Sequence, residues 1–221
     1  MWSWSYAWEL VPVFLDALTV TLAATVCGFA LAVAVGLLLA GLTRSPLKAV
    51  RYPAVAVVDF VRSTPLLVQL LFLYYSLPMI TPFAMSAFLT GVLGLGLHYG
   101  TYLSEVFRSA VDALPKGQWE ASRALNLSRA RTWMSIVLPQ AIPPVLPIMG
   151  NYLIVVFKET PTLSAITLME LLMTAKNETS ASFRAFEPYT VAGALFLAVS
   201  LLMSVLFRRL ESRLNLQGGK R

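Results

Sequence analysis

Residues 117–139 read GQWEASRALNLSRARTWMSIVLP. The segment is polar and basic, yet it lies in a chain of which 57% is apolar and only 13% is charged. Soluble domains are nearer half apolar and a quarter charged, so this composition is typical of a membrane protein. Apolar stretches of about 20 residues, the length that spans a bilayer as a helix, lie on both sides of the segment. We therefore expect the segment to project from a membrane.

The apolar stretches predict an all-helical membrane protein with five transmembrane helices in one bundle. The predicted transmembrane domain is 13–210, with spans at 13–42, 52–77, 83–110, 136–157 and 188–207. Residues 1–12 carry Trp and Tyr side chains, which favour the headgroup interface, and no Lys or Arg. They are expected to be extracytoplasmic, and 211–221 is expected to be a cytoplasmic tail.

Basic residues predict the orientation. By this topology 13 of the 17 Lys and Arg residues lie in cytoplasmic segments, as the positive-inside rule requires. The protein is expected in the cell inner membrane with its N-terminus outside and its C-terminus in the cytoplasm. The net charge of +6 therefore indicates topology rather than nucleic-acid binding. No cleavable signal peptide is expected, because the first residues have no basic n-region and no small-residue cleavage site.

The segment of the opening predicts a helix, a turn and a second helix within residues 115–131. A helix is expected over 118–125, and one so short is marginal in water unless it docks on something. Asn126 tolerates the left-handed conformation that ends a helix, and Ser128 can cap the next one. The prolines that follow, four between 139 and 147, are expected to kink or loosen the first half of the span.

Charged residues within and beside the spans are the candidates for contact with a solute. Each candidate stands one or three residues from an opposite charge, so pairing between neighbours is the competing interpretation, and it is preferred. The predicted pairs are Asp59 with Arg62, Glu105 with Arg108, and Lys158 with Glu159.

Other singular residues favour structural roles. Gly91, Gly94, Gly96 and Gly100 are expected to let helices approach closely. His98 is expected to be packed and hydrogen-bonded, and the lone Cys27 excludes a disulfide within the chain. The polar stretch TPTLSAITLMELLM, in a predicted outer segment 158–187, is expected to form an interfacial or partly re-entrant helix.

The opening segment resembles the EAA loop of ABC-importer permeases. That pattern reads Glu-Ala-Ala, three residues, Gly, nine residues, Ile, any residue, Leu-Pro. Here the chain has Glu120-Ala121-Ser122, Asn126 in place of Gly, and Ile136-Val137-Leu138-Pro139. The resemblance implies a type I, MetI-like permease fold whose coupling helix docks on an ATPase. The implied coupling residues are Gly117, Gln118, Glu120, Ala121, Ser122, Leu125 and Asn126.

Further motifs resemble the polar amino-acid branch of these permeases, of the histidine, glutamine and arginine type. Residues 62–69, RSTPLLVQ, match its R-[GS]-T-P-L-L-V-Q-L signature, and Glu105-Val-Phe-Arg108 matches E-x-x-R. Lys158-Glu159-Thr160 matches K-D-T-S-L, with Pro-Thr in place of Ser-Leu. Some members with K-E-T-P-type bends import ectoine and hydroxyectoine, and the resemblance implies that subgroup as a candidate. The implied substrate-pathway candidates are Asp59, Arg62, Thr64, Glu105, Lys158 and Glu159.

The implied function is import of a polar amino acid or a similar zwitterion. The chain has no G-x-x-x-x-G-K-[ST] motif, so no cofactor is expected on it, and ATP and Mg are expected on the partner ATPase. The implied partners are an ATP-binding subunit dimer, a second permease and an extracytoplasmic solute-binding protein. The alternative is a stand-alone ion-coupled transporter, although no inverted repeat is visible. An enzyme is disfavoured, because a single His leaves little catalytic equipment and no metal-ligand cluster is present.

Overall fold

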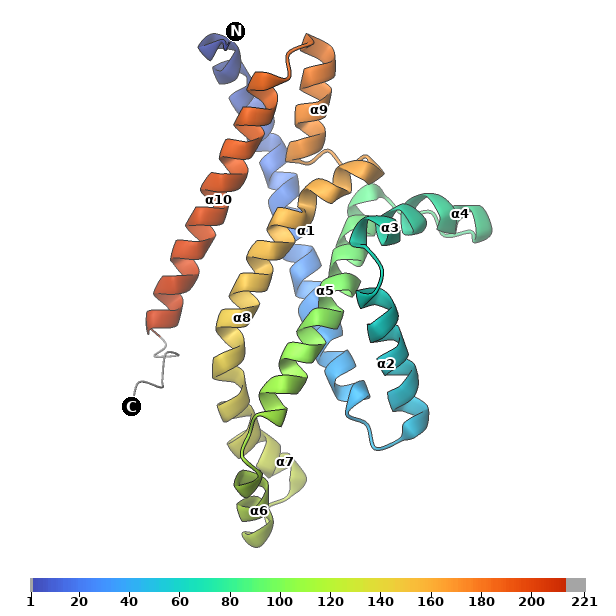
Figure 1. Ribbon diagram of the computed structural model, residues 1–221, viewed down its shortest axis with the longest axis vertical. Coiled ribbons are helices and arrows are strands. Elements are labelled where there is room, and N and C mark those ends of the chain that lie inside the picture. Colours follow the sequence, from blue (N-terminus) through green and yellow to red (C-terminus); the bar gives the residue numbers. More distant parts are fainter. Residues whose placement is uncertain (1, 214–221) are drawn as a thin grey trace.

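The computed structural model describes residues 2–213, and in that range the chain is helical and contains no strand. Figure 1 shows an elongated bundle with the N-terminus at one end and α6 and α7 projecting at the other. The long helices are α1 (Trp4–Thr43), α2 (Lys48–Arg62), α5 (Ala87–Asp112), α8 (Leu138–Glu159) and α10 (Phe186–Arg213). The shorter ones are α3 (Leu66–Leu71), η1 (Phe72–Ser76), α4 (Leu77–Ile80), α6 (Lys116–Ala124), α7 (Arg129–Thr132), η2 (Trp133–Val137), η3 (Thr160–Ile166) and α9 (Leu171–Ser182).

Three stretches are long and apolar enough to cross a membrane: Trp4–Thr43, Arg129–Ile166 and Phe186–Ser212. A fourth is counted if Lys48–Arg62 and Leu66–Ile80 form one broken span. The predicted all-helical membrane architecture is confirmed, while the count of five spans stays a prediction. The last residues of the predicted tail, 214–221, lie outside the described residues.

The first helix is longer than expected. It begins at Trp4 rather than at residue 13, because Ser3 caps its N-terminus by accepting a hydrogen bond from the backbone N–H of Tyr6. At 1.5 Å per residue its 40 residues extend about 60 Å, twice the hydrocarbon thickness of a bilayer. Trp4, Tyr6 and Trp8 are thus part of α1, and Trp2 precedes it.

The predicted second span is wrong as a single helix. The chain breaks between α2 and α3, and the two parts are bent by 103°. Pro65 supplies the reason, because it has no N–H to donate and forces Thr64 away from helical geometry. The Gln69 side chain replaces part of the lost bonding, with its Nε2 donating to Val61 O at 2.8 Å and to Thr64 Oγ1 at 2.7 Å.

Helices α1 and α5 pack in parallel along a glycine seam. A Cβ added at Gly96 would lie 2.5 Å from the Leu31 side chain, and one added at Gly100 would lie 2.7 Å from Val35. The other two glycines of α5 pack against other elements: Gly91 faces Leu163 of η3, and Gly94 faces Leu70 of α3. The predicted packing role of all four glycines is confirmed.

The remaining long helices alternate in direction. Tyr102 of α5 faces Tyr152 of α8, whereas Gly91, earlier in α5, faces Leu163 beyond the end of α8, so these helices are antiparallel. Gly150 of α8 meets Phe207 of α10, and Phe157 meets Phe196, which makes that pair antiparallel too. Helices α1, α5 and α10 therefore run in one direction and α8 runs in the other.

Two details of the second half differ from expectation. The prolines of α8 do not break it, because that helix is continuous from Leu138 to Glu159. The irregularity lies just before them, in the π-helical turn η2. The expected helix over TPTLSAITLMELLM is two elements, the 3-10 helix η3 and the start of α9, separated where Thr167 takes a left-handed conformation with φ 62°.

Candidate functional site

The first candidate site is the projecting pair α6 and α7. Helix α6 ends at Ala124, and Asn126, two residues later, takes the predicted left-handed conformation with φ 49°. The N–H groups of Leu127 and Asn126 bond back to the carbonyls of Ser122 and Arg123, both at 3.0 Å, which closes a Schellman motif. Ser128 then caps α7 by accepting from Arg131 N. The turn needs no glycine, because Asn supplies the left-handed residue.

One face of α6 is held to the body of the protein. The Trp119 and Trp133 rings meet edge to face at 5.8 Å, and Gln140 Nε2 of α8 donates to Gln118 Oε1 at 3.2 Å. Ser122 is buried and donates to its own helix, at the carbonyl of Gln118. Ser122 is on the face of α6 that packs on the rest of the protein, so a small residue suits this position.

The opposite face of α6 is free within this chain. Gly117, Glu120 and Ala121 are exposed, and Leu125 is 71% exposed. This face is therefore open to contact with another protein. The predicted coupling residues therefore divide into two groups. Gln118 and Ser122 anchor the helix, and the exposed residues form its outward surface.

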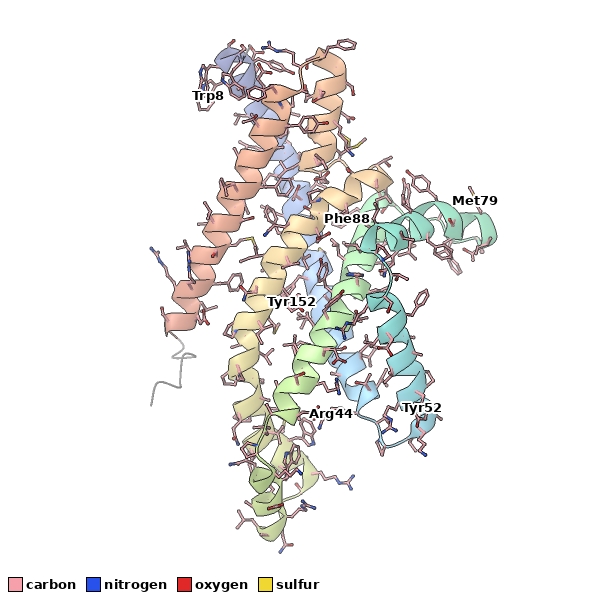
Figure 2. All side chains as sticks on the ribbon, in the orientation of Figure 1. Trp8, Arg44, Tyr52, Met79, Phe88 and Tyr152 are labelled. Carbon is pink, nitrogen blue, oxygen red and sulfur yellow. The ribbon has the colours of Figure 1, made fainter. Side chains whose placement is uncertain are left out.

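The second candidate site is a cavity of about 410 Å³ between α2, α5 and α8. Arg62, Tyr102, Glu105 and Tyr152 supply its polar lining, and Figure 2 shows Tyr152 between α5 and α8. The Arg62 guanidinium lies 5.0 Å from the centroid of the Tyr102 ring. The volume lies within the roughly 300–1,000 Å³ of small-molecule sites.

An aromatic cluster lies at this cavity, and two of its members, Tyr102 and Tyr152, line it. The rings of Tyr99, Tyr102 and Tyr152 lie 6.0–6.4 Å apart, and His98 stacks beside the first two. His98 is buried, and its Nδ1 lies 3.2 Å from Gln69 Oε1. The expectation of a packed, hydrogen-bonded histidine is confirmed. Gln69 thus connects the break after α2 with the cluster on α5.

The structure brings only some of the predicted solute contacts together. Arg62 and Glu105 line the same cavity, and Thr64 holds the break beside it. Glu105 also accepts from Arg108 at 2.5 Å, so this predicted pair is confirmed. Asp59 is exposed and does not line the cavity.

The other two predicted ion pairs are wrong. Among the described residues no salt bridge joins Asp59 to Arg62, because the Arg62 guanidinium lies over the Tyr102 ring instead. None joins Lys158 to Glu159, since neighbours on a helix point in different directions. Both lie at the far end of α8 and outside the cavity lining.

Sequence reasoning missed Gln69, Tyr99, Tyr102 and Tyr152 as site residues. The tyrosines at 99 and 102 are three residues apart on α5, and helical spacing places them on one face. Tyr152 is 50 positions further along the chain, and no local pattern connects it with the others. In the sequence, Gln69 is only one residue of the 62–69 motif. Its role at the helix break can be recognised only in the folded structure.

These two sites on one helical bundle define a class: a membrane component with a partly polar cavity that opens at its surface and a helical projection at one end. Residues 32–216 match the family described as "Binding-protein-dependent transport system inner membrane component", and the chain belongs to this family.

Relatives place the chain within the amino-acid branch of that family, as predicted. It is 39% identical over 217 residues to the probable amino-acid ABC transporter permease protein y4tG of Sinorhizobium fredii, covering 97% of this chain and 92% of the relative. It is 32% identical over 215 residues to the glutamine transport system permease protein GlnP of Escherichia coli K12, covering 96% and 98%.

Solved structures agree with this placement. One described as an amino acid ABC transporter with histidines superposes with a TM-score of 0.90 at 32% identity, covering 96% of this chain and 99% of that one. A methionine ABC transporter in an inward-facing conformation superposes with a TM-score of 0.71 at 20% identity, covering 96% and 99%, and shows a shared fold.

Proposed function

We propose that this chain is the permease subunit of a binding-protein-dependent ABC importer that carries a polar amino acid or a similar zwitterion into the cell. The observation that carries the proposal is the position of α6 in a chain that belongs to this family. The helix lies at the end of the bundle, contacts the protein on one face and is exposed on the other. The ion-coupled alternative has no comparable support, because its mechanism has no use for a docking helix.

The bracing of α6 explains how force would enter the bundle. An ATPase that moves the exposed residues around Glu120 also moves Trp119 and Gln118, which contact Trp133 and Gln140. Those two residues belong to η2 and α8, so the movement passes into a helix that lines the cavity. ATP and Mg act on the separate subunit, and this chain converts their work into a change of bundle geometry.

The proposed orientation has α6 in the cytoplasm and the N-terminus outside. The basic segments around α6 support it, with Arg123, Arg129 and Arg131 at the same end of the bundle as Arg44 and Arg51. The helix directions support it too. Helix α10, like α5, is antiparallel to α8 and so runs in the same direction as α1. The two termini therefore lie on opposite sides of the bundle.

The cavity between α2, α5 and α8 is the proposed path of the solute. A zwitterion needs partners for both charges. The Arg62 guanidinium suits a carboxylate, while Glu105 and the tyrosine faces suit a cationic nitrogen. Ectoine, a zwitterion with a carboxylate and a delocalised cation, fits this chemistry as amino acids do. Because the cavity opens at the surface of one chain, a second permease is proposed to close the path, and a solute-binding protein to deliver the cargo.

A reversal of charge at Glu120 tests the coupling. We expect the complex with Glu120→Lys to lose most ATP-driven uptake in proteoliposomes and to recover less ATPase subunit in a pull-down. Glu211→Lys, a matched reversal near the end of α10, should leave both unchanged. Uptake driven by an ion gradient in the absence of the ATPase subunit would contradict the proposal.

A further inference from the structure

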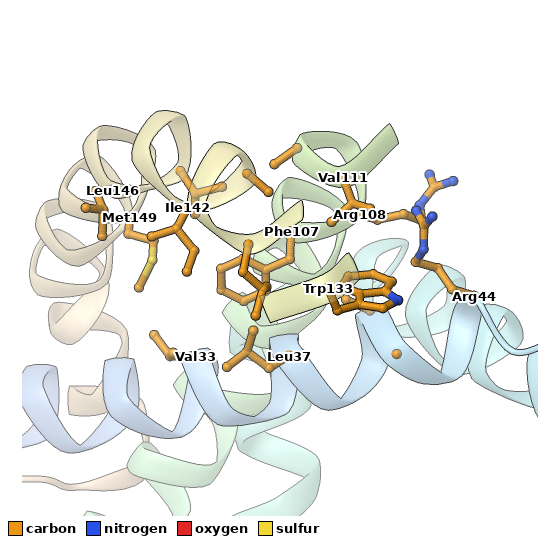
Figure 3. Close-up of a pocket in the computed structure, with 16 residues that line it drawn as sticks. Val33, Leu37, Arg44, Phe107, Arg108, Val111, Trp133, Ile142, Leu146 and Met149 are labelled. Atoms are coloured by element: carbon orange, nitrogen blue, oxygen red, sulfur yellow. The ribbon is translucent and has the colours of Figure 1, made fainter. Parts of the chain in front are cut away.

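A second cavity, of about 390 Å³, lies between α1, α5 and α8 near the α6 end. Figure 3 shows Val33 and Leu37 of α1 facing Ile142 and Met149 of α8 across it. The lining is apolar along most of its length and includes side chains open to the outside of the chain, among them Leu37, which is 57% exposed. This groove shares Ala110 and Val145 with the cavity that contains Arg62, and the rest of its lining is different.

The groove has the length of one bilayer leaflet. Its lining along α1 and its C-cap runs from Val33 to Arg44, eleven steps that rise about 16 Å at 1.5 Å each. Half of a hydrocarbon core of about 30 Å is about 15 Å. An acyl chain of one leaflet therefore matches the groove from the bilayer centre to the interface.

One end of the groove carries two arginines, each paired with a carboxylate. Arg44 and Arg108 lie together there beside Trp133, away from the apolar end (Figure 3). Arg44 Nη1 bonds Asp112 and Arg108 Nη2 bonds Glu105, but each guanidinium has five N–H donors. Arg108 Nε is buried and has no hydrogen-bond partner. Because the Arg44 and Arg108 side chains are 31% and 41% exposed, other donors of the two guanidinium groups remain at the place where a headgroup would lie.

We propose that this groove binds an anionic phospholipid, with an acyl chain along α1 and α8 and the headgroup phosphate against Arg44 and Arg108. The assignment of the lipid to the cytoplasmic leaflet rests on the orientation proposed above; the binding itself does not. Arginine suits phosphate because its planar donors match two oxygens at once, and Trp133, which lines the same end, is a residue type that favours the headgroup interface.

The lipid would act on the coupling segment through Trp133. This ring lines the groove and also braces Trp119 of α6. An occupied groove therefore holds the base of the coupling segment in place, and an empty one leaves the Trp133 side chain without packing on that side. ATPase activity that responds to anionic lipid is the expected consequence.

The test uses the permease with its ATPase, purified in nanodiscs of phosphatidylglycerol and phosphatidylcholine in equal amounts, and native mass spectrometry of the released complex. Two variants separate headgroup from chain. Arg44→Gln removes a cation, and Gly41→Leu fills the groove, since a Cβ at Gly41 meets no atom within 4 Å. Gly193→Leu is the matched control, because Gly193 on α10 is equally open and does not line the groove.

Wild type and Gly193→Leu should retain phosphatidylglycerol in preference to phosphatidylcholine. Arg44→Gln should lower that preference about fivefold, the effect of roughly 1 kcal/mol for one cation near a membrane surface. Gly41→Leu should retain less of both lipids. Equal retention by all four proteins would overturn the proposal. So would Gly41→Leu separating two permease chains in the same spectra, which would identify a second copy as the occupant.

Discussion

Helix α5 has two faces that differ in how they are packed. Toward α1 it presents Gly96 and Gly100, and the backbones approach until even a methyl group would collide. Toward α2 and α8 it presents Tyr102 and Glu105, with a cavity of about 410 Å³ between the helices. The first face makes α1 and α5 one rigid unit. The second leaves room for a solute and for movement of α8.

The largest expected effect comes from filling the close face. Gly100→Val would place atoms within 2.8 Å of the Val35 Cβ, and overpacking of this kind costs about 3 kcal/mol or more where backbone must shift. We expect loss of most folded protein, measured by fluorescence-detected size exclusion. Gly193→Val makes the same substitution where no atom lies within 4 Å. If both variants fold equally well, the rigid unit does not exist.

The next effect tests the far end of the rigid unit, where α9 lies on α1. Glu170 is fully buried between the spans and caps α9, and Leu171 N donates to Thr21 Oγ1 of α1 at 3.2 Å. Burial raises the pKa of Glu170 to about 7 from 4.5, against the two backbone N–H groups that favour its ionised form.

Because the folded-state pKa lies above the unfolded one, folding takes up a proton between about pH 4.5 and pH 7. The resulting stability is complete below that window and is lost as the pH rises through 7. The shift amounts to roughly 3 kcal/mol. Thermal melting between pH 5 and pH 8 should therefore show a decline in wild type that Glu170→Gln lacks. A decline of the same size in both proteins would rule out this carboxyl as its source.

The open face should respond in transport rather than in folding. Arg62→Ala removes a guanidinium that lines the cavity, and loss of a charge-assisted hydrogen bond of 1.5–3 kcal/mol predicts about ten- to hundredfold weaker uptake. Arg51→Ala is the matched control. Arg51 is on the same helix as Arg62 and likewise lies over a tyrosine ring, 5.2 Å from the Tyr52 centroid, but it does not line the cavity. Unchanged affinity and rate in Arg62→Ala would leave the cavity without a role in transport.

The smallest effect concerns the link from α6 to the open face. Gln118→Ala removes the hydrogen bond to Gln140, which is exposed and worth about 1 kcal/mol. We expect a few-fold decrease in the ratio of solute imported to ATP hydrolysed, with ATPase binding retained. Gln140→Ala should lower the ratio equally, and the double variant should lower it no further. Additive losses would show that the two amides act separately.

The coupling segment could be predicted from the sequence because its signals are local. The helix, the left-handed Asn126 and the cap at Ser128 each depend on residues a few positions apart, and a fixed spacing carries the family resemblance. The glycine packing on α5 was also predictable, since small residues in an apolar helix have few other uses.

The cavity could be predicted only in part, because it is assembled from three helices. Arg62 and Glu105 were visible as costly charges in apolar stretches. The partner of Arg62 could not be predicted, because the choice between Asp59 and the Tyr102 ring depends on how α2 lies against α5. The 103° bend had a local sign in Pro65, but its angle depends on the packing of Leu66 and Leu70 beneath α5.

The parallel course of α1 and α5 has a consequence for biogenesis. Two parallel helices cannot meet as a simple hairpin while the chain is being inserted, since everything from α2 to α4 must first return to the side on which α1 began. The glycine seam can therefore close only once α5 is in place, because Gly28 and Gly36 of α1 are covered by Leu95 and Leu103 of α5. A cell that inspects membrane proteins for unassembled helices would find this one exposed before that point.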